Sequence, residues 1–212
     1  EYRAEIEGTF IRYVKFGNEW NVYLPDGSLW KFGKDLDSTI SSGEKTFRWY
    51  IESMRDANGN LVEFKYTKLD ETTAVYLESV SYNDGISKVL FEYETRPDIL
   101  LSYRSTFSVE TRFRIENIST FNYGEKVFSY EFKYDSITDW NSLSRLVKVR
   151  KNAGDGSIYG PPTSYTYTRF SIDNPVTKYV PSAKTIPLSS HDTDFIDINA
   201  DGLPDVINTG AS

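Results

Sequence analysis

The stretch Val127-Phe128-Ser129-Tyr130-Glu131-Phe132-Lys133-Tyr134 places an aromatic residue at every second position from Phe128 onwards. A period of two puts these aromatic side chains on one face of an extended strand, whereas a helix would distribute them around its axis. Val89, Phe91 and Tyr93 repeat the pattern with polar residues between them. The sequence therefore predicts strands that each carry one apolar face.

Short turn sequences separate the predicted strands. Residues 25–28, 56–60 and 83–85 combine glycine with aspartate or asparagine. These residues tolerate the left-handed backbone of tight hairpin turns. Helical periodicity is nearly absent along the chain. We expect an all-β fold of about ten to twelve strands, in which successive antiparallel hairpins form a large curved sheet or sandwich with few or no helices.

A loose internal repeat recurs along the chain. Each copy begins with two aliphatic residues three positions apart and ends in an aromatic-x-Tyr triplet. The pairs are Ile51/Met54, Leu77/Val80, Ile115/Ile118 and Leu146/Val149, and the triplets are Phe64-Lys65-Tyr66, Phe91-Glu92-Tyr93, Phe132-Lys133-Tyr134 and Tyr165-Thr166-Tyr167. Residues three apart on a flat strand face opposite sides, so each pair predicts either a two-sided strand or a β-bulge. A strip of hairpins that needs neighbours to cover it would meet this pattern.

Composition excludes several classes of function. The 212 residues carry 31 acidic and 24 basic side chains, for a net charge of −7. This balance argues against nucleic acid as a partner, because such proteins present a basic surface. The absence of cysteine excludes disulfides and thiol chemistry. No apolar run reaches the roughly 20 residues of a membrane span, and the start at Glu1 without a signal sequence suggests a fragment of a longer protein.

The texture of the sequence changes near its C-terminal end. Pro175, Pro181 and Pro187 stand in a stretch with few strand signals. We therefore expect a hairpin-rich domain over residues 1–170, a proline-rich linker over residues 171–190 and a different element over residues 191–212.

That last element contains a candidate calcium loop. Its oxygen ligands occupy alternate positions, with a glycine at the sharp turn: Asp197, Asn199, Asp201, the Leu203 carbonyl and Asp205, with Gly202 between the third and fourth. Calcium prefers six to eight oxygen ligands in such a flexible cage. The twelfth position is Asn208 instead of glutamate, and the flanking residues are typical of strands rather than of EF-hand helices. The alternative is an acidic turn that holds no metal.

Other candidate sites are weaker. Ser190, His191 and Asp192 are adjacent and cannot adopt the geometry of a catalytic triad, so we interpret His191 as a solvated linker residue. Trp140 stands in a predicted loop and is the best candidate for contacting a sugar or a host surface, although packing against another part of a longer protein explains it equally well. No catalytic motif is present, and we expect the protein not to be an enzyme.

Several stretches resemble a known family. Asp26-Gly27-Ser28-Leu29-Trp30-Lys31-Phe32-Gly33 is similar to a hairpin in the N-terminal SpvB or TcdB-type region of insecticidal toxin complex B components. Residues 49–66 resemble an RHS/YD repeat, and residues 91–105 also resemble this toxin region. Residues 195–206 resemble the start of an FG-GAP/VCBS propeller repeat.

This resemblance implies a large secreted or cell-surface bacterial toxin-like protein. Such proteins have a β-shell around a C-terminal cargo and a propeller that docks to a pore-forming partner. The chain would then be a non-catalytic part of the shell next to the propeller, with calcium as a possible cofactor. Its partners would be other domains of the same protein and the pore-forming toxin. No catalytic residue is implied. The alternative function is a carbohydrate- or host-surface-binding β-module.

Overall fold

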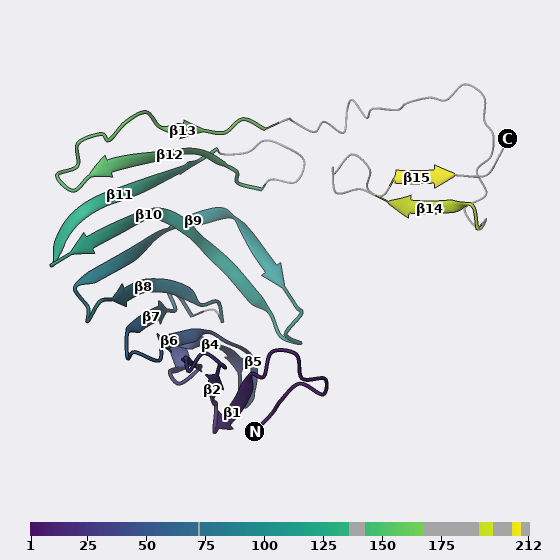
Figure 1. The fold of residues 1–212 in the computed structure, drawn as a ribbon. Coiled ribbons are helices and arrows are strands. Elements are labelled where there is room, and N and C mark those ends of the chain that lie inside the picture. Colours follow the sequence, from purple (N-terminus) through teal and green to yellow (C-terminus); the bar gives the residue numbers. More distant parts are fainter. Residues whose placement is uncertain (72, 136–142, 168–190, 197–204, 209–212) are drawn as a thin grey trace. The chain divides into compact units, whose positions relative to one another are not determined.

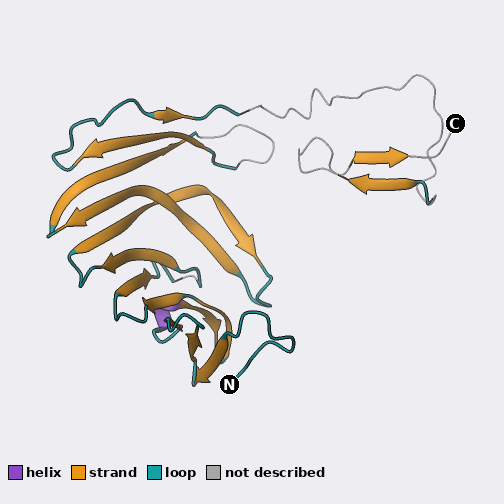
Figure 2. Ribbon diagram, in the orientation of Figure 1, coloured by secondary structure: helices purple, strands orange, loops and turns teal. Residues whose placement is uncertain are grey.

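The computed structural model describes residues 1–71, 73–135, 143–167, 191–196 and 205–208. The chain divides into two compact units, Glu1–Phe170 and Ser171–Ser212. Apart from one 3-10 turn at Leu36–Ser38, the regular structure of the described residues is entirely β (Figure 2). The prediction of an all-β fold with few or no helices is confirmed.

The first unit is a long succession of hairpins (Figure 1). Its strands are β1 (Arg12–Phe16), β2 (Glu19–Tyr23), β3 (Leu29–Phe32), β4 (Thr39–Ser42), β5 (Lys45–Trp49), β6 (Ile51–Arg55), β7 (Leu61–Thr67), β8 (Tyr76–Tyr82), β9 (Ser87–Ser102), β10 (Val109–Asn122), β11 (Glu125–Tyr134), β12 (Leu146–Ala153) and β13 (Thr163–Ser164). An 11-stranded sheet follows chain order, with only β4 and β5 left out as a separate hairpin between β3 and β6. Neighbouring strands pair antiparallel throughout.

The predicted turn residues form the hairpin connections. Between β8 and β9, Asn83 and Asp84 have φ angles of 55° and 52° and Gly85 has φ 80°. This left-handed run matches the twist of the flanking strands. Between β6 and β7, the Asp56 carboxylate accepts hydrogen bonds from the backbone N–H groups of Asn58 and Asn60 at 2.9 and 2.8 Å.

One side chain ties the β4–β5 hairpin to the sheet. The Glu52 carboxylate in β6 accepts hydrogen bonds from the backbone N–H groups of Lys34 and Asp35 at 3.1 and 2.6 Å, and from the Ser38 hydroxyl at 2.6 Å. These donors surround the 3-10 turn that leads into β4. A single carboxylate thus accepts the hydrogen bonds of the polar groups at the point where the chain leaves the main sheet.

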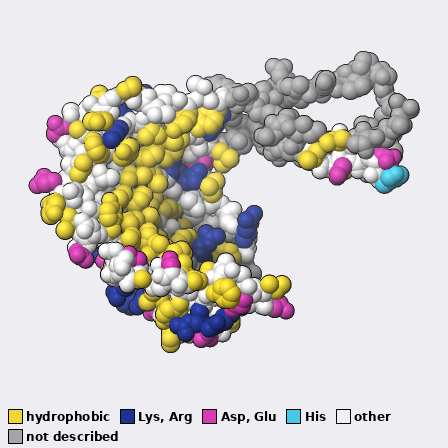
Figure 3. Space-filling view, viewed as in Figure 1, with side chains coloured by type: hydrophobic (Ala, Val, Ile, Leu, Met, Phe, Trp, Pro, Cys, Tyr) yellow, Lys and Arg dark blue, Asp and Glu magenta, His cyan; other side chains and the backbone are white. Residues whose placement is uncertain are grey.

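The first unit buries few apolar side chains. Among the described residues, the buried hydrophobic ones are Val22, Ile40, Ala74 and Tyr76. Apolar sheet faces are normally packed against a second layer. Figure 3 shows hydrophobic side chains gathered in a broad patch over the sheet. The first unit is therefore a single curved sheet whose apolar face lacks a covering layer within the described residues.

The described part of the second unit is one hairpin. Strand β14 (Thr193–Ile196) pairs antiparallel with β15 (Asp205–Asn208), and Phe195 lies opposite Val206. The predicted linker over residues 171–190 lies outside the described residues.

Candidate functional site

Four strands of the sheet carry a β-bulge at equivalent positions. In β6, β8, β10 and β12, one residue beside the first aliphatic position of the repeat is left out of the pairing with the preceding strand of the sheet. These extra residues are Glu52, Glu78, Glu116 and Val147. Each directly follows the first aliphatic residue of a repeat copy. The repeat therefore encodes a bulge, which decides between the two structures that its spacing allowed.

The bulge brings both aliphatic residues of a copy to one face. Ile115 lies opposite Tyr93, and Ile118 lies opposite Phe91. Since Phe91 and Tyr93 are two apart on β9, they share a face of the sheet. The other bulged strands follow the same arrangement, in which Ile51/Met54 lie opposite Phe32/Trp30, Leu77/Val80 opposite Tyr66/Phe64, and Leu146/Val149 opposite Tyr134/Phe132.

A tyrosine hydroxyl binds the backbone beside each bulge. Each of these tyrosines, which we call the tyrosine latches, donates to the carbonyl of the first aliphatic residue at an oxygen–oxygen distance of 2.7 Å. The pairs are Tyr66 to Ile51, Tyr93 to Leu77, Tyr134 to Ile115 and Tyr167 to Leu146. A bulge disrupts the local ladder of backbone hydrogen bonds. The hydroxyl thus supplies a partner to a carbonyl at the point of disruption.

A second side chain packs against each tyrosine latch. It comes from the residue directly before the aliphatic pair. The ring centroids of Tyr50 and Tyr66 lie 5.2 Å apart, as do those of Tyr76 and Tyr93.

In the later copies an arginine takes this position. The guanidinium carbons of Arg114 and Arg145 lie 4.2 and 5.1 Å from the ring centroids of Tyr134 and Tyr167. Tyrosine and arginine both stack favourably on an aromatic ring. Sequence reasoning missed this position, although its place in the repeat is constant.

Burial shifts the titration of the tyrosine latches. It raises the pKa of Tyr66 and of Tyr93 to about 12, because a phenolate would lose its hydration there. Burial also raises the pKa of Tyr134, against the opposing effect of the nearby Arg114. The neutral hydroxyl, which is the form able to donate, is therefore the stable form at physiological pH.

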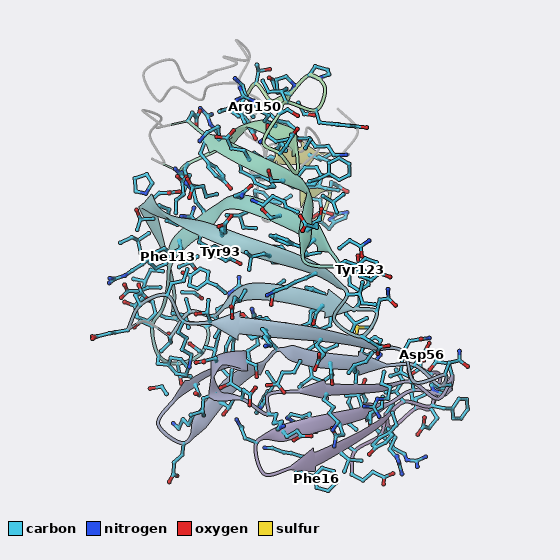
Figure 4. The ribbon with its side chains drawn as sticks, turned by 90° about the vertical axis from the view of Figure 1, so that its left-hand side faces the viewer. Phe16, Asp56, Tyr93, Phe113, Tyr123 and Arg150 are labelled. Carbon is cyan, nitrogen blue, oxygen red and sulfur yellow. The ribbon has the colours of Figure 1, made fainter. Side chains whose placement is uncertain are left out.

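The two sides of the sheet differ in chemistry. Directly paired residues face the same side, and one side carries a continuous apolar surface, which we call the open face. Its central members, all partly exposed, are Phe64, Val80, Val89, Phe91, Ile118, Tyr130, Phe132 and Val149. Figure 4 shows Tyr93 with Phe113 nearby on the same sheet, and the buried Tyr76 ring contacts both.

The opposite side is polar. Asn117 donates to the Glu92 carboxylate at 2.7 Å, and Glu131 pairs with Lys133 at 2.7 Å and with Arg150 at 3.8 Å. Glu92, Asn117, Glu131 and Arg150 form one row across four strands. One-sided sheets of this kind have a solvated face and a face to be covered.

Strands β9 and β10 extend beyond their neighbours. β8 pairs only with Ser87–Leu90 of β9, while β10 follows β9 as far as Ser102. At the far end, Ile99, Leu101 and Tyr103 are 52%, 52% and 66% exposed. We call this projecting end, residues 95–113, the arm.

Asp98 fixes the base of the arm. Its carboxylate receives two hydrogen bonds from Arg96, at 3.1 and 2.8 Å, and two from the backbone and hydroxyl of Ser144, at 2.7 and 2.8 Å. The bonds from Arg96, followed by those from Ser144, hold the pKa of Asp98 well below its usual range. The side chain is thus a structural tie between the arm and the segment that leads into β12.

The residues predicted to bind ligands lie mostly outside the described part of the chain. Asp197, Asn199, Asp201, Leu203 and Trp140 fall there, and Asp205 is described only as the first residue of β15. The strands expected on both sides of the calcium loop are present and pair with each other. Calcium binding and the Trp140 contact stay predictions.

The described residues contain neither a metal-binding cluster nor a membrane-spanning helix. No group of three or more acidic or histidine side chains gathers there in a way that could hold a metal ion. In the same residues, no helix has the length and apolar character needed to cross a membrane.

Comparison with known proteins agrees with the predicted resemblance. Residues 1–93 match the family model of SpvB, the Salmonella virulence plasmid 65kDa B protein. No curated protein sequence matches the chain.

Solved structures share the fold at low sequence identity. The crystal structure of TcdB2-TccC3-Cdc42 matches 99% of this chain with a TM-score of 0.68 and 19% identity, over 13% of its own length. The N-terminal domain of the effector SpvB from Salmonella typhimurium strain LT2 matches 71% of this chain and 68% of its own, with a TM-score of 0.61 and 18% identity. The Photorhabdus luminescens Tc holotoxin pore matches 91% of this chain and 12% of its own, with a TM-score of 0.64 and 19% identity.

The chain therefore spans about an eighth of the toxin chains that it matches. The resemblance of residues 195–206 to a propeller repeat stays a prediction. The resemblance to the N-terminal SpvB/TcdB-type region is confirmed, because residues 1–93 carry the SpvB match and the chain has the fold of the SpvB N-terminal domain and of part of the toxin-complex chains.

Proposed function

We propose that the chain is a non-catalytic structural segment of a large bacterial RHS/toxin-complex-like protein, in which its sheet forms part of a shell wall. The open face is the observation that carries this proposal. Burial of apolar surface stabilises a protein by about 25 cal/mol per Å², so a face of this extent favours a covering layer. Parts of a longer chain would supply that layer.

The repeat supports the same function. Each hairpin adds an aliphatic pair, a bulge and a tyrosine latch in the same arrangement. Bulges bend and twist a strand, so a regular series of them builds a curved sheet. A curved sheet with a solvated outer side and an apolar inner side is suited to a wall.

A structural role also accounts for the most perturbed carboxylate in the described residues. Asp98 has a strongly lowered pKa, which can mark a catalytic group. Here Arg96 and Ser144 already occupy its oxygens. The lowered pKa therefore reflects hydrogen bonds that hold two parts of the fold together.

The finer parts of the proposal concern the second unit and the setting of the protein. We propose that residues 191–212 begin a calcium-binding propeller repeat with Asp197, Asn199, Asp201, the Leu203 carbonyl and Asp205 as ligands. We also propose that the protein is secreted or surface-delivered and acts with a pore-forming partner. Calcium titration by calorimetry tests the first point. Binding that Asp201→Ala abolishes would support it, and the absence of binding would leave a plain turn.

The shell function is tested by placing a charge on each side of the sheet in turn. Phe91 belongs to the open face, whereas the exposed Lys88 lies on the opposite side of the same strand. In the longer protein that contains this chain, Phe91→Lys should give a protease-sensitive, poorly assembled product, while Lys88→Glu should leave assembly unchanged.

The chain on its own provides a second readout. It should bind an apolar fluorescent dye such as ANS in its native state, because the open face is uncovered. Full assembly of the longer protein with Phe91→Lys, together with no dye binding by the chain, would refute the wall function.

A further inference from the structure

An open aromatic pocket lies at the N-terminal end of the sheet. Its volume is about 320 Å³, and its lining consists of Tyr13, Trp20, Val22, Phe32 and Trp49. Pockets for small molecules span roughly 300–1,000 Å³, so this one suits a single ring. The indoles of Trp20 and Trp49 meet edge to face, with ring centroids 6.1 Å apart.

The Trp49 ring is held in place from two directions. Its Nε1 donates a hydrogen bond of 3.0 Å to Asn18 Oδ1, which also accepts one of 3.0 Å from the Thr46 hydroxyl. On another side the indole lies against Gly33, where a Cβ atom would come within 2.1 Å of Trp49 Cδ1. A ring fixed in this way binds a ligand without losing conformational freedom.

A cation at the rim selects the class of ligand. Lys15 Nζ lies 5.5 Å from the ring centroids of both Trp20 and Trp49. Aromatic cages commonly bind quaternary ammonium groups. In this pocket Lys15 would repel such a ligand, so the occupant is neutral or carries a negative charge.

We propose that this pocket binds the ring of a pyranose sugar, and that Lys15 favours a sugar that bears a carboxylate. The apolar C–H face of a pyranose stacks on an indole, while its hydroxyl groups stay in water at the open side of the pocket. The pocket is lined by aromatic and apolar side chains, and Lys15 Nζ beside it supplies a partner for a carboxylate. The pocket combines a fixed tryptophan ring with a cation beside the rings.

The test is saturation-transfer NMR and calorimetry with three probes. These are the methyl glycoside of N-acetylneuraminic acid, which is acidic, methyl β-glucopyranoside, which is neutral, and glucosamine, which is cationic. We expect saturable millimolar binding of the acidic and neutral sugars and none of glucosamine. Trp20→Ala should weaken binding of both by at least about tenfold.

Lys15→Met separates the role of charge from that of stacking. It should weaken binding of the acidic sugar by up to about fivefold, since an exposed ion pair contributes little, and leave binding of the neutral sugar unchanged. Tyr13→Ala provides a pocket variant at the sheet edge, and Tyr123→Ala, at an exposed turn outside the pocket, is the matched control. Thermal unfolding confirms that each variant is folded.

Three results would overturn the proposal. They are no saturable binding of any probe, binding that survives both Trp20→Ala and Tyr13→Ala, and preference for glucosamine. Sedimentation tests whether a second copy of the chain fills the pocket instead. Self-association that is lost in Trp20→Ala, without any sugar binding, would show this. The wall function stands or falls separately, since it rests on Phe91 and the open face.

Discussion

Strands β1–β3 and strands β6–β12 use the same alternation of apolar and polar residues but pair differently. β1, β2 and β3 pair without any shift of register. From β6 to β12, every second strand contains a bulge with a tyrosine latch beside it. Alternation alone thus sets which side is apolar, and the bulges add the bend.

The two regions also hold their aromatic side chains by different means. In β6–β12 a tyrosine hydroxyl bonds to the backbone of the strand before it. Around β1–β3, rings pack against one another: the ring centroids of Tyr2 and Trp20 lie 5.3 Å apart, and those of Trp20 and Trp49 lie 6.1 Å apart. We infer that the stability of the first region depends mainly on the room around its rings, and that of the second on its tyrosine hydrogen bonds.

The largest effect is expected from a substitution in the first region that fills the space beside the Trp49 ring. Gly33→Ala should lower the free energy of unfolding by about 3 kcal/mol, because the new Cβ meets Trp49 and the backbone has a left-handed φ. The distance to Trp49 Cδ1 would be 2.1 Å, and φ is 67°. Urea unfolding gives the energy, and near-UV circular dichroism should show a disturbed tryptophan signal.

Gly43 is the matched control for Gly33. Its φ of 58° is similar, but no atom lies within 4 Å of a Cβ built there. Gly43→Ala should therefore cost only the backbone term of about 1 kcal/mol. Equal losses in both variants would show that the Trp49 contact does not matter and would break the packing account of β1–β3.

A smaller effect is expected from removing the charge of Asp98, whose hydrogen bonds hold the base of the arm. Asp98→Asn should cost about 2 kcal/mol at about pH 7, because Arg96 would lose a charged partner in a largely buried site. The side chains of Arg96 and Asp98 are only 13% and 5% exposed. The folded-state pKa of Asp98 is lowered, so its contribution is present above the ordinary aspartate pKa of about 3.9 and is lost as the pH falls below that value.

Unfolding by urea across this pH range checks the sign. The difference between Asp98→Asn and the unchanged protein should shrink towards zero on acidification. Glu1→Gln, which alters an exposed pair with Arg3, should leave the unfolding midpoint unchanged. A loss that stays the same in acid would mean that the charge of Asp98 does not stabilise the arm.

The repeat was predictable because it is local in sequence. Each aliphatic pair and aromatic-x-Tyr triplet is visible in the sequence alone, and so are the turns at Asp56 and Asn83. The choice between a bulge and a two-sided strand was not predictable, because register depends on the neighbouring strand. The position before each pair, whose side chain packs against the latch, was missed because tyrosine and arginine share little except the ability to pack on a ring.

The aromatic pocket could not be assembled from sequence for a different reason. Trp49 belongs to β5, outside the main sheet, and reaches Gly33 only because the β4–β5 hairpin returns the chain there. The sequence contains no local sign of that return. Glu52, which holds the 3-10 turn, likewise acts on residues 14 to 18 positions away.

The smallest effect concerns a single tyrosine latch. Tyr93→Phe removes the donor to the Leu77 carbonyl and should cost about 1 kcal/mol, the usual net value of one hydrogen bond. Tyr167→Phe should cost less, because Tyr167 is 45% exposed and water can replace its hydroxyl. Urea unfolding of both variants gives the comparison, and equal losses would indicate that the latches act independently of burial.

Alkaline pH tests whether the neutral Tyr93 hydroxyl is buried in the folded chain. The pKa of Tyr93 is raised to about 12 in the folded chain, against about 10 in the unfolded one. Its contribution is therefore complete below about pH 10 and is lost as the pH rises through about 12. The unchanged protein should lose stability over this interval more steeply than Tyr93→Phe. Parallel curves would show that folding does not raise the pKa of Tyr93, and that burial of its hydroxyl does not stabilise the latch.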